Sequence, residues 1–62
     1  MTKHVYLASK NDAIAWPNHR KYPFCHVHFP AIGNTQLVHI YHYENGTWKY
    51  LSFYLVDMNR NN

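Results

Sequence analysis

The sequence predicts an α+β fold in which a four-stranded, mostly antiparallel sheet has one short helix on one face, in the order β-α-β-β-β. Three observations predict this class. Residues 36–57 contain two runs rich in β-branched and aromatic residues on either side of an Asn-Gly pair. Residues 3–8 and 24–29 alternate between apolar and polar side chains, as half-buried strands do. Residues 9–16 begin with a pattern close to a helix cap.

The first half of the chain supplies one strand and the helix. In residues 3–8, Val5 and Leu7 point to one side of the expected strand. Ser9 then suits a helix N-cap, and Asp12 three residues later suits the positive end of the helix dipole. Pro17 limits this helix to about two turns because it disfavours helical geometry at the residue before it. The alternative is a second short strand over residues 13–16, after a turn.

The second half supplies the other three strands. Residues 24–29 form a strand that ends at Pro30, and a loop leads into the hairpin. The Asn-Gly pair favours a type I′ turn, since both residues tolerate positive φ. A two-residue turn fixes the pairing from Glu44 opposite Thr47 outward to Leu37 opposite Tyr54. A bulge would shift this sorting of side chains on one strand.

Alternation then sorts the four strands into two faces. The aliphatic face, partly shielded by the helix, is expected to contain Val5, Leu7, Cys25, Val27, Phe29, Val38, Ile40, Leu51, Phe53 and Leu55. The opposite, aromatic face is expected to contain His4, Tyr6, Phe24, His26, His28, His39, Tyr41, Tyr43, Trp48, Tyr50 and Tyr54. No second helix is predicted that could cover these rings, and soluble monomers rarely expose so large an apolar patch. We therefore expect another molecule to cover the aromatic face. The alternative is an all-β small barrel or sandwich with the rings as its core.

Length and composition set the scale of the protein. We expect one small domain over residues 1–58 and a disordered polar tail over 59–62. A chain of 62 residues buries a limited core, and its single cysteine forms no internal disulfide. The N-terminus lacks a signal-peptide pattern, and the stretch 22–43, although free of Asp, Glu, Lys and Arg, contains prolines and histidines. We therefore expect a cytoplasmic protein without a membrane span, stabilised by self-association or by a partner.

Catalytic chemistry finds little support. The three acidic residues fall in different elements, and there is no glycine-rich phosphate loop or Ser-His-Asp arrangement. Cys25 is expected on the core face as a small hydrophobic residue without a charge that would activate it. Residues 19–22 contain a base, two cations and a phenol, but such a group is more typical of a solvated loop than of a nuclease. We therefore predict no enzyme and no cofactor.

Histidines provide the remaining chemical candidates. His26 and His28 lie on one strand face about 6.6 Å apart along the strand, and His4 or His39 from a neighbouring strand could complete a metal site. The same face offers no carboxylate or thiolate. We therefore assign no metal ligands, and keep a histidine-ligated metal-binding protein as a second alternative. A pH-sensitive interface is a further reading of these residues.

The sequence thus predicts a small non-enzymatic binding protein of the regulator, adapter or inhibitor type found in bacteria and their viruses. It would dock on a protein partner, or on itself as a homodimer, through its aromatic, histidine-rich face. The predicted docking residues are Tyr6, His26, His28, His39, Tyr41, Tyr43, Trp48, Tyr50 and Tyr54. The first alternative is a single-stranded nucleic-acid-binding module. Its phosphate contacts would come from His19, Arg20, Lys21 and Lys49.

Overall fold

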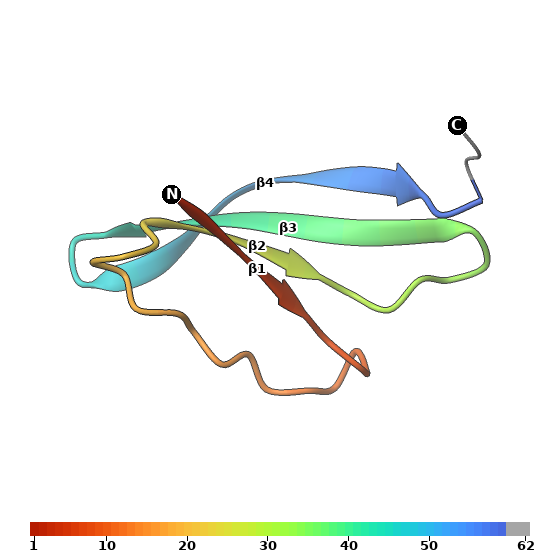
Figure 1. The fold of residues 1–62 in the computed structure, drawn as a ribbon, viewed down its shortest axis with the longest axis horizontal. Helices are drawn as coiled ribbons and strands as arrows, with labels where there is room; N and C mark the ends of the chain where they lie inside the picture. The colour runs from red at the N-terminus through yellow and green to blue at the C-terminus, as the bar shows by residue number, and fades with distance from the viewer. Residues whose placement is uncertain (60–62) are drawn as a thin grey trace.

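Four strands form one sheet in the computed structural model, which describes residues 1–59 (Figure 1). They are β1 (Thr2–Tyr6), β2 (Phe24–His28), β3 (Thr35–Glu44) and β4 (Thr47–Asp57). Their order in the sheet follows the chain, β1-β2-β3-β4. The first pair is parallel, and the other two pairs are antiparallel. The expected polar tail lies outside the described residues except for Asn59.

The described chain contains no helix, so the predicted helix and the α+β class are wrong. The all-β alternative fits, although the strands form a single open sheet and not a barrel or sandwich. No helix among residues 1–59 is therefore long and apolar enough to cross a membrane. The four predicted strands are all present, with β1 beginning one residue earlier than expected and ending two residues earlier.

Ser9 and Asp12 form a single turn instead of starting a helix. The Asp12 carboxylate accepts hydrogen bonds from the backbone N–H groups of Ala8 and Ser9, at 2.9 and 3.1 Å. The backbone N–H of Asp12 donates to the Ser9 carbonyl at 3.1 Å. This is half of a capping arrangement, and nothing continues it, because Pro17 leaves too few residues for a stable helix.

The connection between β1 and β2 carries the chain back to the starting edge of the sheet. Parallel strands require the chain to return along the full length of the sheet before the next strand begins. Residues 7–23 make this return as an irregular segment, which we call the 7–23 connection (Figure 1).

The hairpin follows its predicted register only as far as the middle of the strands. Asn45 and Gly46 have φ values of 51° and 82°, as a type I′ turn requires. Pairing is as predicted from Glu44 opposite Thr47 to Tyr41 opposite Tyr50. The next pair is Ile40 with Ser52, so β4 has one extra residue, Leu51, in a β-bulge.

The strand pairing defines two faces of the sheet, because paired residues share a face and neighbours alternate. The histidine face contains His4, Tyr6, Phe24, His26, His28, Gln36, Val38, Ile40, His42, Glu44, Lys49, Ser52, Tyr54 and Val56. The tryptophan face contains Lys3, Val5, Cys25, Val27, Leu37, His39, Tyr41, Tyr43, Trp48, Tyr50, Phe53 and Leu55.

These faces differ from the predicted ones. Cys25 lies opposite Tyr41, and Val27 lies opposite His39, so the aromatic side of β3 joins the aliphatic side of β2. Val38 and Ile40, expected beside these aliphatic residues, lie on the histidine face instead. The prediction failed because alternation sorts side chains within each strand but does not set the register between β2 and β3.

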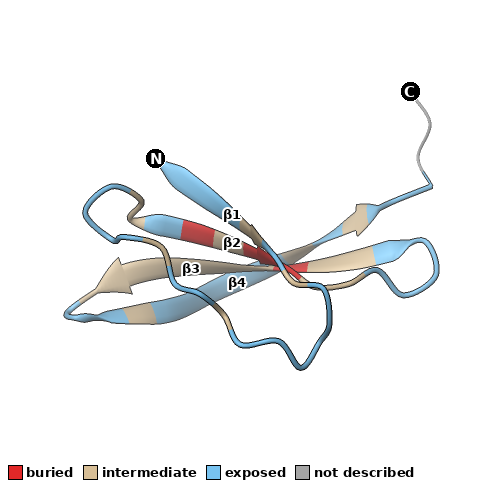
Figure 2. Ribbon diagram, turned by 60° about the horizontal axis from the view of Figure 1, so that its bottom comes forward, coloured by how far each residue is buried: buried red, intermediate tan, exposed pale blue. Residues whose placement is uncertain are grey.

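Three side chains form the fully buried core. Cys25, Val27 and Val38 have no exposed surface, and Figure 2 shows the buried residues confined to the two central strands. Cys25 and Val27 lie on the tryptophan face, whereas Val38 lies on the histidine face, next to the buried His28. Burial raises the pKa of the Cys25 thiol. The sheet therefore has a small core divided between its two sides.

We expect Val38→Ala to lower the free energy of unfolding by about 2 kcal/mol, because it removes two buried carbon groups and leaves a cavity. Urea denaturation followed by circular dichroism measures the change. Ile32→Ala is the matched control, since Ile32 is 85% exposed, and it should change stability by less than about 0.5 kcal/mol. Equal effects of the two substitutions would contradict the assignment of Val38 to the core.

Candidate binding faces

The 7–23 connection packs on the turn end of the tryptophan face. The Trp16 ring stacks on Trp48 with centroids 5.3 Å apart and an interplanar angle of 14°. It also meets Tyr41 edge-on at 4.9 Å. Further along the connection, His19 stacks on Tyr43 at 3.8 Å. The rings of the tryptophan face, which were predicted to be covered by another molecule, are thus partly covered by the chain itself.

Tyr41 shows how this cover changes the chemistry of the face. Its side chain is half-buried between Trp16 and Tyr50 and lies opposite the buried Cys25. Burial raises the pKa of Tyr41, and the neighbouring Tyr50 and Cys25 raise it further. Tyr41 therefore serves as a packed ring and not as an open docking residue.

The other end of the tryptophan face has no such cover. A groove with a volume of about 540 Å³ lies there, lined by Lys10, Phe29, Pro30, Ala31, Ile32, Thr35, Leu37 and Leu55. Near the groove, Phe53 and Leu55 are 55% and 61% exposed. Both were expected in a covered aliphatic core. They are exposed because the helix that was to shield them is absent and the ring contacts of the 7–23 connection lie nearer the turn.

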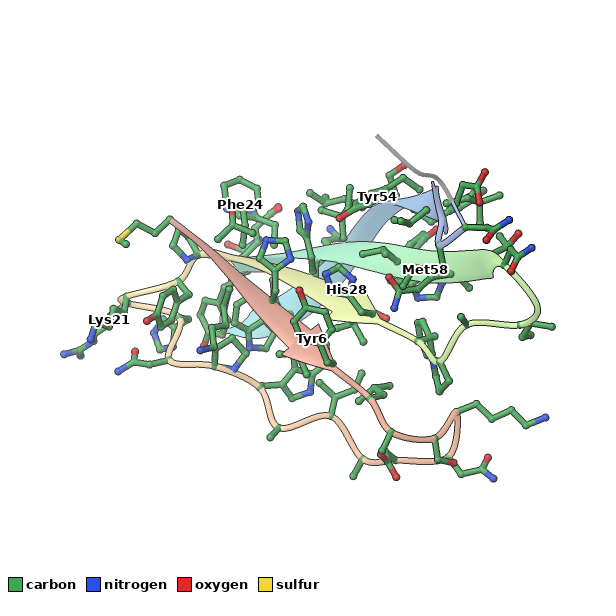
Figure 3. All side chains as sticks on the ribbon, turned by 45° about the vertical axis from the view of Figure 1, so that its right-hand side comes forward. Tyr6, Lys21, Phe24, His28, Tyr54 and Met58 are labelled. Carbon is green, nitrogen blue, oxygen red and sulfur yellow. The ribbon has the colours of Figure 1, made fainter. Side chains whose placement is uncertain are left out.

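The histidine face brings together three histidines from β1 and β2. The His4 ring lies 5.0 Å from both His26 and His28, between centroids. His4 Nδ1 and His28 Nε2 are 2.8 Å apart and share a hydrogen bond. Tyr6 stacks on His28 at 4.3 Å. Figure 3 shows Tyr6 next to His28, with Phe24 and Tyr54 along the same side of the sheet.

Hydrogen bonds fix these rings from the neighbouring strands. The Gln36 Oε1 atom lies 3.3 Å from His28 Nδ1, and the Tyr54 hydroxyl lies 3.2 Å from His26 Nδ1. Because Gln36 Oε1 accepts, His28 Nδ1 donates, and a neutral His28 then has its lone pair on Nε2. His4 Nδ1 donates to that lone pair. Every ring in the cluster is thereby held in one orientation.

The surroundings of His26 in this cluster also change its pKa. Burial lowers the pKa of His26, and the nearby His4 and His28 lower it further. Both effects disfavour the charged imidazolium, since burial removes water from it and neighbouring positive charge repels it. His26 is therefore favoured in its neutral form beside the Tyr54 hydroxyl.

Residues 1–59 contain no group of three or more His, Cys, Asp and Glu side chains arranged to hold a metal ion. The proposed nucleic-acid contacts are not gathered into one site either. His19 is stacked on Tyr43 of the tryptophan face, whereas Lys49 is on the histidine face. The Lys21 ammonium lies over the Tyr22 ring at 6.0 Å, and Lys3 lies over the same ring at 5.5 Å.

The predicted docking residues therefore separate into two groups. Tyr6, His26, His28 and Tyr54 lie together on the histidine face. His39, Tyr41, Tyr43, Trp48 and Tyr50 lie on the tryptophan face, where His39 also contacts Phe29 at 4.8 Å. The prediction missed Trp16 as the cover of this second group, because it placed Trp16 in a helix over the aliphatic side. It also omitted His4 and Phe24 from the docking set, although alternation had placed both on the aromatic face.

Comparisons with known proteins found no match: no family model, no curated protein and no solved structure resembles the chain significantly.

We expect Trp16→Ala to lower the free energy of unfolding by about 2 kcal/mol, since it removes two aromatic contacts and their buried area. Trp16→Phe is the matched control, because a smaller ring still covers Trp48. In both variants Trp48 is the only tryptophan. Trp48 fluorescence should therefore shift to longer wavelength in the alanine variant relative to the phenylalanine variant. Identical emission spectra would show that Trp16 does not cover Trp48.

We expect the protein to lose stability as pH falls from neutral through the ordinary histidine pKa, about 6.5. The folded-state pKa of His26 is lowered, so the unfolded chain binds its proton first and acid favours unfolding. The contribution of neutral His26 to the free energy of unfolding is fully present above about pH 6.5, the ordinary value. It is lost as the pH falls through the lower, folded-state pKa of His26. Urea unfolding across a pH series measures it. His26→Gln should reduce the pH dependence, and His19→Gln, outside the cluster, should retain it. An unchanged pH dependence in His26→Gln would contradict this assignment.

Proposed function

We propose that the chain is a small non-enzymatic binding protein that docks on a protein through its histidine face. The observation that carries the proposal is an open layer of rings on a rigid sheet. Tyr6 is 70% exposed and stacks on His28, which is held by hydrogen bonds, and Phe24 is 38% exposed and packs against His42. Tyrosine and phenylalanine are enriched at the centres of protein interfaces.

Pre-organisation supports a binding role for this face. Binding is weakened by the entropy lost when side chains become ordered, and rings that are already fixed lose less. Tyr6 is stacked on His28, and His28 is bonded to His4 and Gln36. The face therefore presents its rings in one arrangement before a partner arrives.

The charge pattern favours a protein over a nucleic acid. Among the strand residues of the histidine face, the only acidic or basic side chains other than histidine are Glu44 and Lys49, both near the hairpin turn. The centres of protein interfaces are depleted in charge, whereas nucleic-acid affinity comes mainly from phosphate contacts with Lys and Arg. One lysine on the face is a poor basis for phosphate binding.

The same proposal assigns the protein to the regulators, adapters or inhibitors of a reducing cytoplasm. Cys25 is a free, buried thiol, and small secreted domains usually depend on disulfides instead.

The test is affinity capture from the native cell extract, with and without nuclease, followed by mass spectrometry and a binding titration with the purified partner. Tyr6→Ala combined with Phe24→Ala should weaken binding about 30-fold, as removal of an interface centre costs about 2 kcal/mol or more. Tyr50→Ala is the matched control, since Tyr50 is 49% exposed on the other face, and it should bind normally.

Two results would contradict the proposal. Equal binding by the double variant and the wild type would remove the histidine face from the interface. Capture that disappears after nuclease treatment would show that nucleic acid, and not a protein contact, mediates the association.

A further inference from the structure

Half of the exposed large hydrophobic side chains in the described part of the chain lie along one edge of the sheet. On β4 and just beyond it, Tyr50, Leu51, Phe53, Leu55 and Met58 are each about half exposed, with values from 49% to 61%. β4 pairs with β3 on one side, and none of the described strands pairs with its other side. An unpaired strand presents a row of backbone N–H and C=O groups that can join another strand.

The two edges of the sheet differ in how well they resist such joining. β1 is five residues long and includes Lys3, so it is short and charged. β4 is eleven residues long, and residues 50–56 contain neither a charge nor a proline. Natural sheets protect their edges with short strands, lysines, prolines and bulges. β4 has only the bulge at Leu51, which leaves residues 52–57 regular and open.

The core of the sheet is small, so burial of the β4 edge would add stability that the single chain lacks. Only Cys25, Val27 and Val38 are fully buried hydrophobic side chains among the described residues. Chains of this length with limited cores usually gain stability from disulfides, metals or oligomers. The single cysteine excludes an internal disulfide. A second copy of the chain would supply the missing buried surface.

We propose that two copies of this chain associate through antiparallel pairing of their β4 strands, which gives one continuous eight-stranded sheet. The two-fold axis is perpendicular to the sheet, so each face of one copy continues into the same face of the other. Paired residues must therefore lie on the same face, so their positions in β4 differ by an even number. The axis consequently passes through one residue, which lies opposite its own copy. This interface uses the edge of β4 and leaves Tyr6 and Phe24 of the proposed docking face free.

The register follows from the apolar side chains. With the axis at Tyr54, Phe53 lies opposite Leu55 of the second copy, and Leu55 lies opposite Phe53 of that copy. These four side chains form one cluster on the tryptophan face, against the Leu55 wall of the groove. An axis at Phe53 would place Leu55 opposite Leu51 of the second copy, and the bulge at Leu51 interrupts the alternation there.

The area available on β4 is close to that of a specific dimer. Five half-exposed side chains offer roughly 100 Å² each, or about 500 Å² of side-chain surface per copy. The backbone of the paired strands adds to this area. Stable interfaces bury about 800 Å² per partner. Pairing over β4 therefore approaches the size that a lasting interface needs.

Analytical ultracentrifugation tests the association. The wild type should sediment at twice the monomer mass of 7.5 kDa. Phe53→Lys should shift the equilibrium to monomer, because it removes the apolar contact and places two like charges across the axis. Thr2→Lys is the matched control, since Thr2 is exposed on β1, the other edge strand, and it should remain dimeric. A wild type that stays monomeric would overturn the proposal.

Cross-linking tests the register without depending on the stability of Phe53→Lys. Two residues on the axis have Cβ atoms about 4.5–5.5 Å apart, near the range that a disulfide requires. Tyr54→Cys should therefore form a covalent dimer under mild oxidation, whereas Lys49→Cys, five residues from the axis, should not. Cys25 is buried and does not compete. Equal cross-linking of the two variants would overturn the register.

The result also separates this interface from the histidine face. A dimer that persists in Phe53→Lys but dissociates in Tyr6→Ala with Phe24→Ala would place self-association on the histidine face and reject the β4 interface. A dimer lost in Phe53→Lys and retained in the double variant would support the β4 interface, whatever the outcome of the partner-binding experiment.

Discussion

The antiparallel pairing of β2 with β3 is the constraint on which the rest of the structure depends. It places Cys25 opposite Tyr41 and Val27 opposite His39, and so assigns the aromatic side of the hairpin to the side with the small aliphatic residues. The histidines of β1 and β2 are thereby grouped with the aliphatic side of β3. A shift of one residue in this pairing would move every ring of β3 to the other face.

This pairing explains why the two faces have different characters. On the tryptophan face, short side chains such as Cys25 and Val27 leave room for large rings, and the 7–23 connection covers these rings with Trp16. On the histidine face, Val38 and Ile40 of β3 lie beneath larger polar rings, and the Tyr54 hydroxyl reaches across β3 to His26. Neither face has a second layer of regular secondary structure among residues 1–59. Order therefore comes from ring stacking and hydrogen bonds more than from a deep core.

Local patterns in the sequence predicted the strands and the turn well. Asn45-Gly46 located the hairpin, and alternation located β1 and β2, because both features depend on neighbours in the chain. Cys25 and Val27 were correctly placed in the core for the same reason. The helix failed because its only support was a capping pattern at Ser9 and Asp12, and those groups bond equally well in an isolated turn.

The candidate site depended on contacts between distant parts of the chain, and these were harder to predict. The bulge at Leu51 returns Phe53 and Leu55 to the side of Val27, and no residue type in β4 marks it. The register between β2 and β3 likewise has no local signature. Trp16 was expected to pack on the side of Cys25 and Val27, and it lies on that side, but the rings that it contacts there depended on this register. The grouping of Tyr6, His26 and His28 was predicted because β1 and β2 each have their aliphatic residues on the other side, and these aliphatic residues share a face.

The position of Cys25 gives the molecule an internal reporter of its own opening. The thiol is completely enclosed in the central strand, opposite Tyr41 of β3. Alkylating reagents reach such a sulfur only after the groups that cover it on the tryptophan face move away, and burial also keeps it in the less reactive thiol form. The rate at which Cys25 becomes labelled under native conditions therefore measures how often this cover opens, without any added probe.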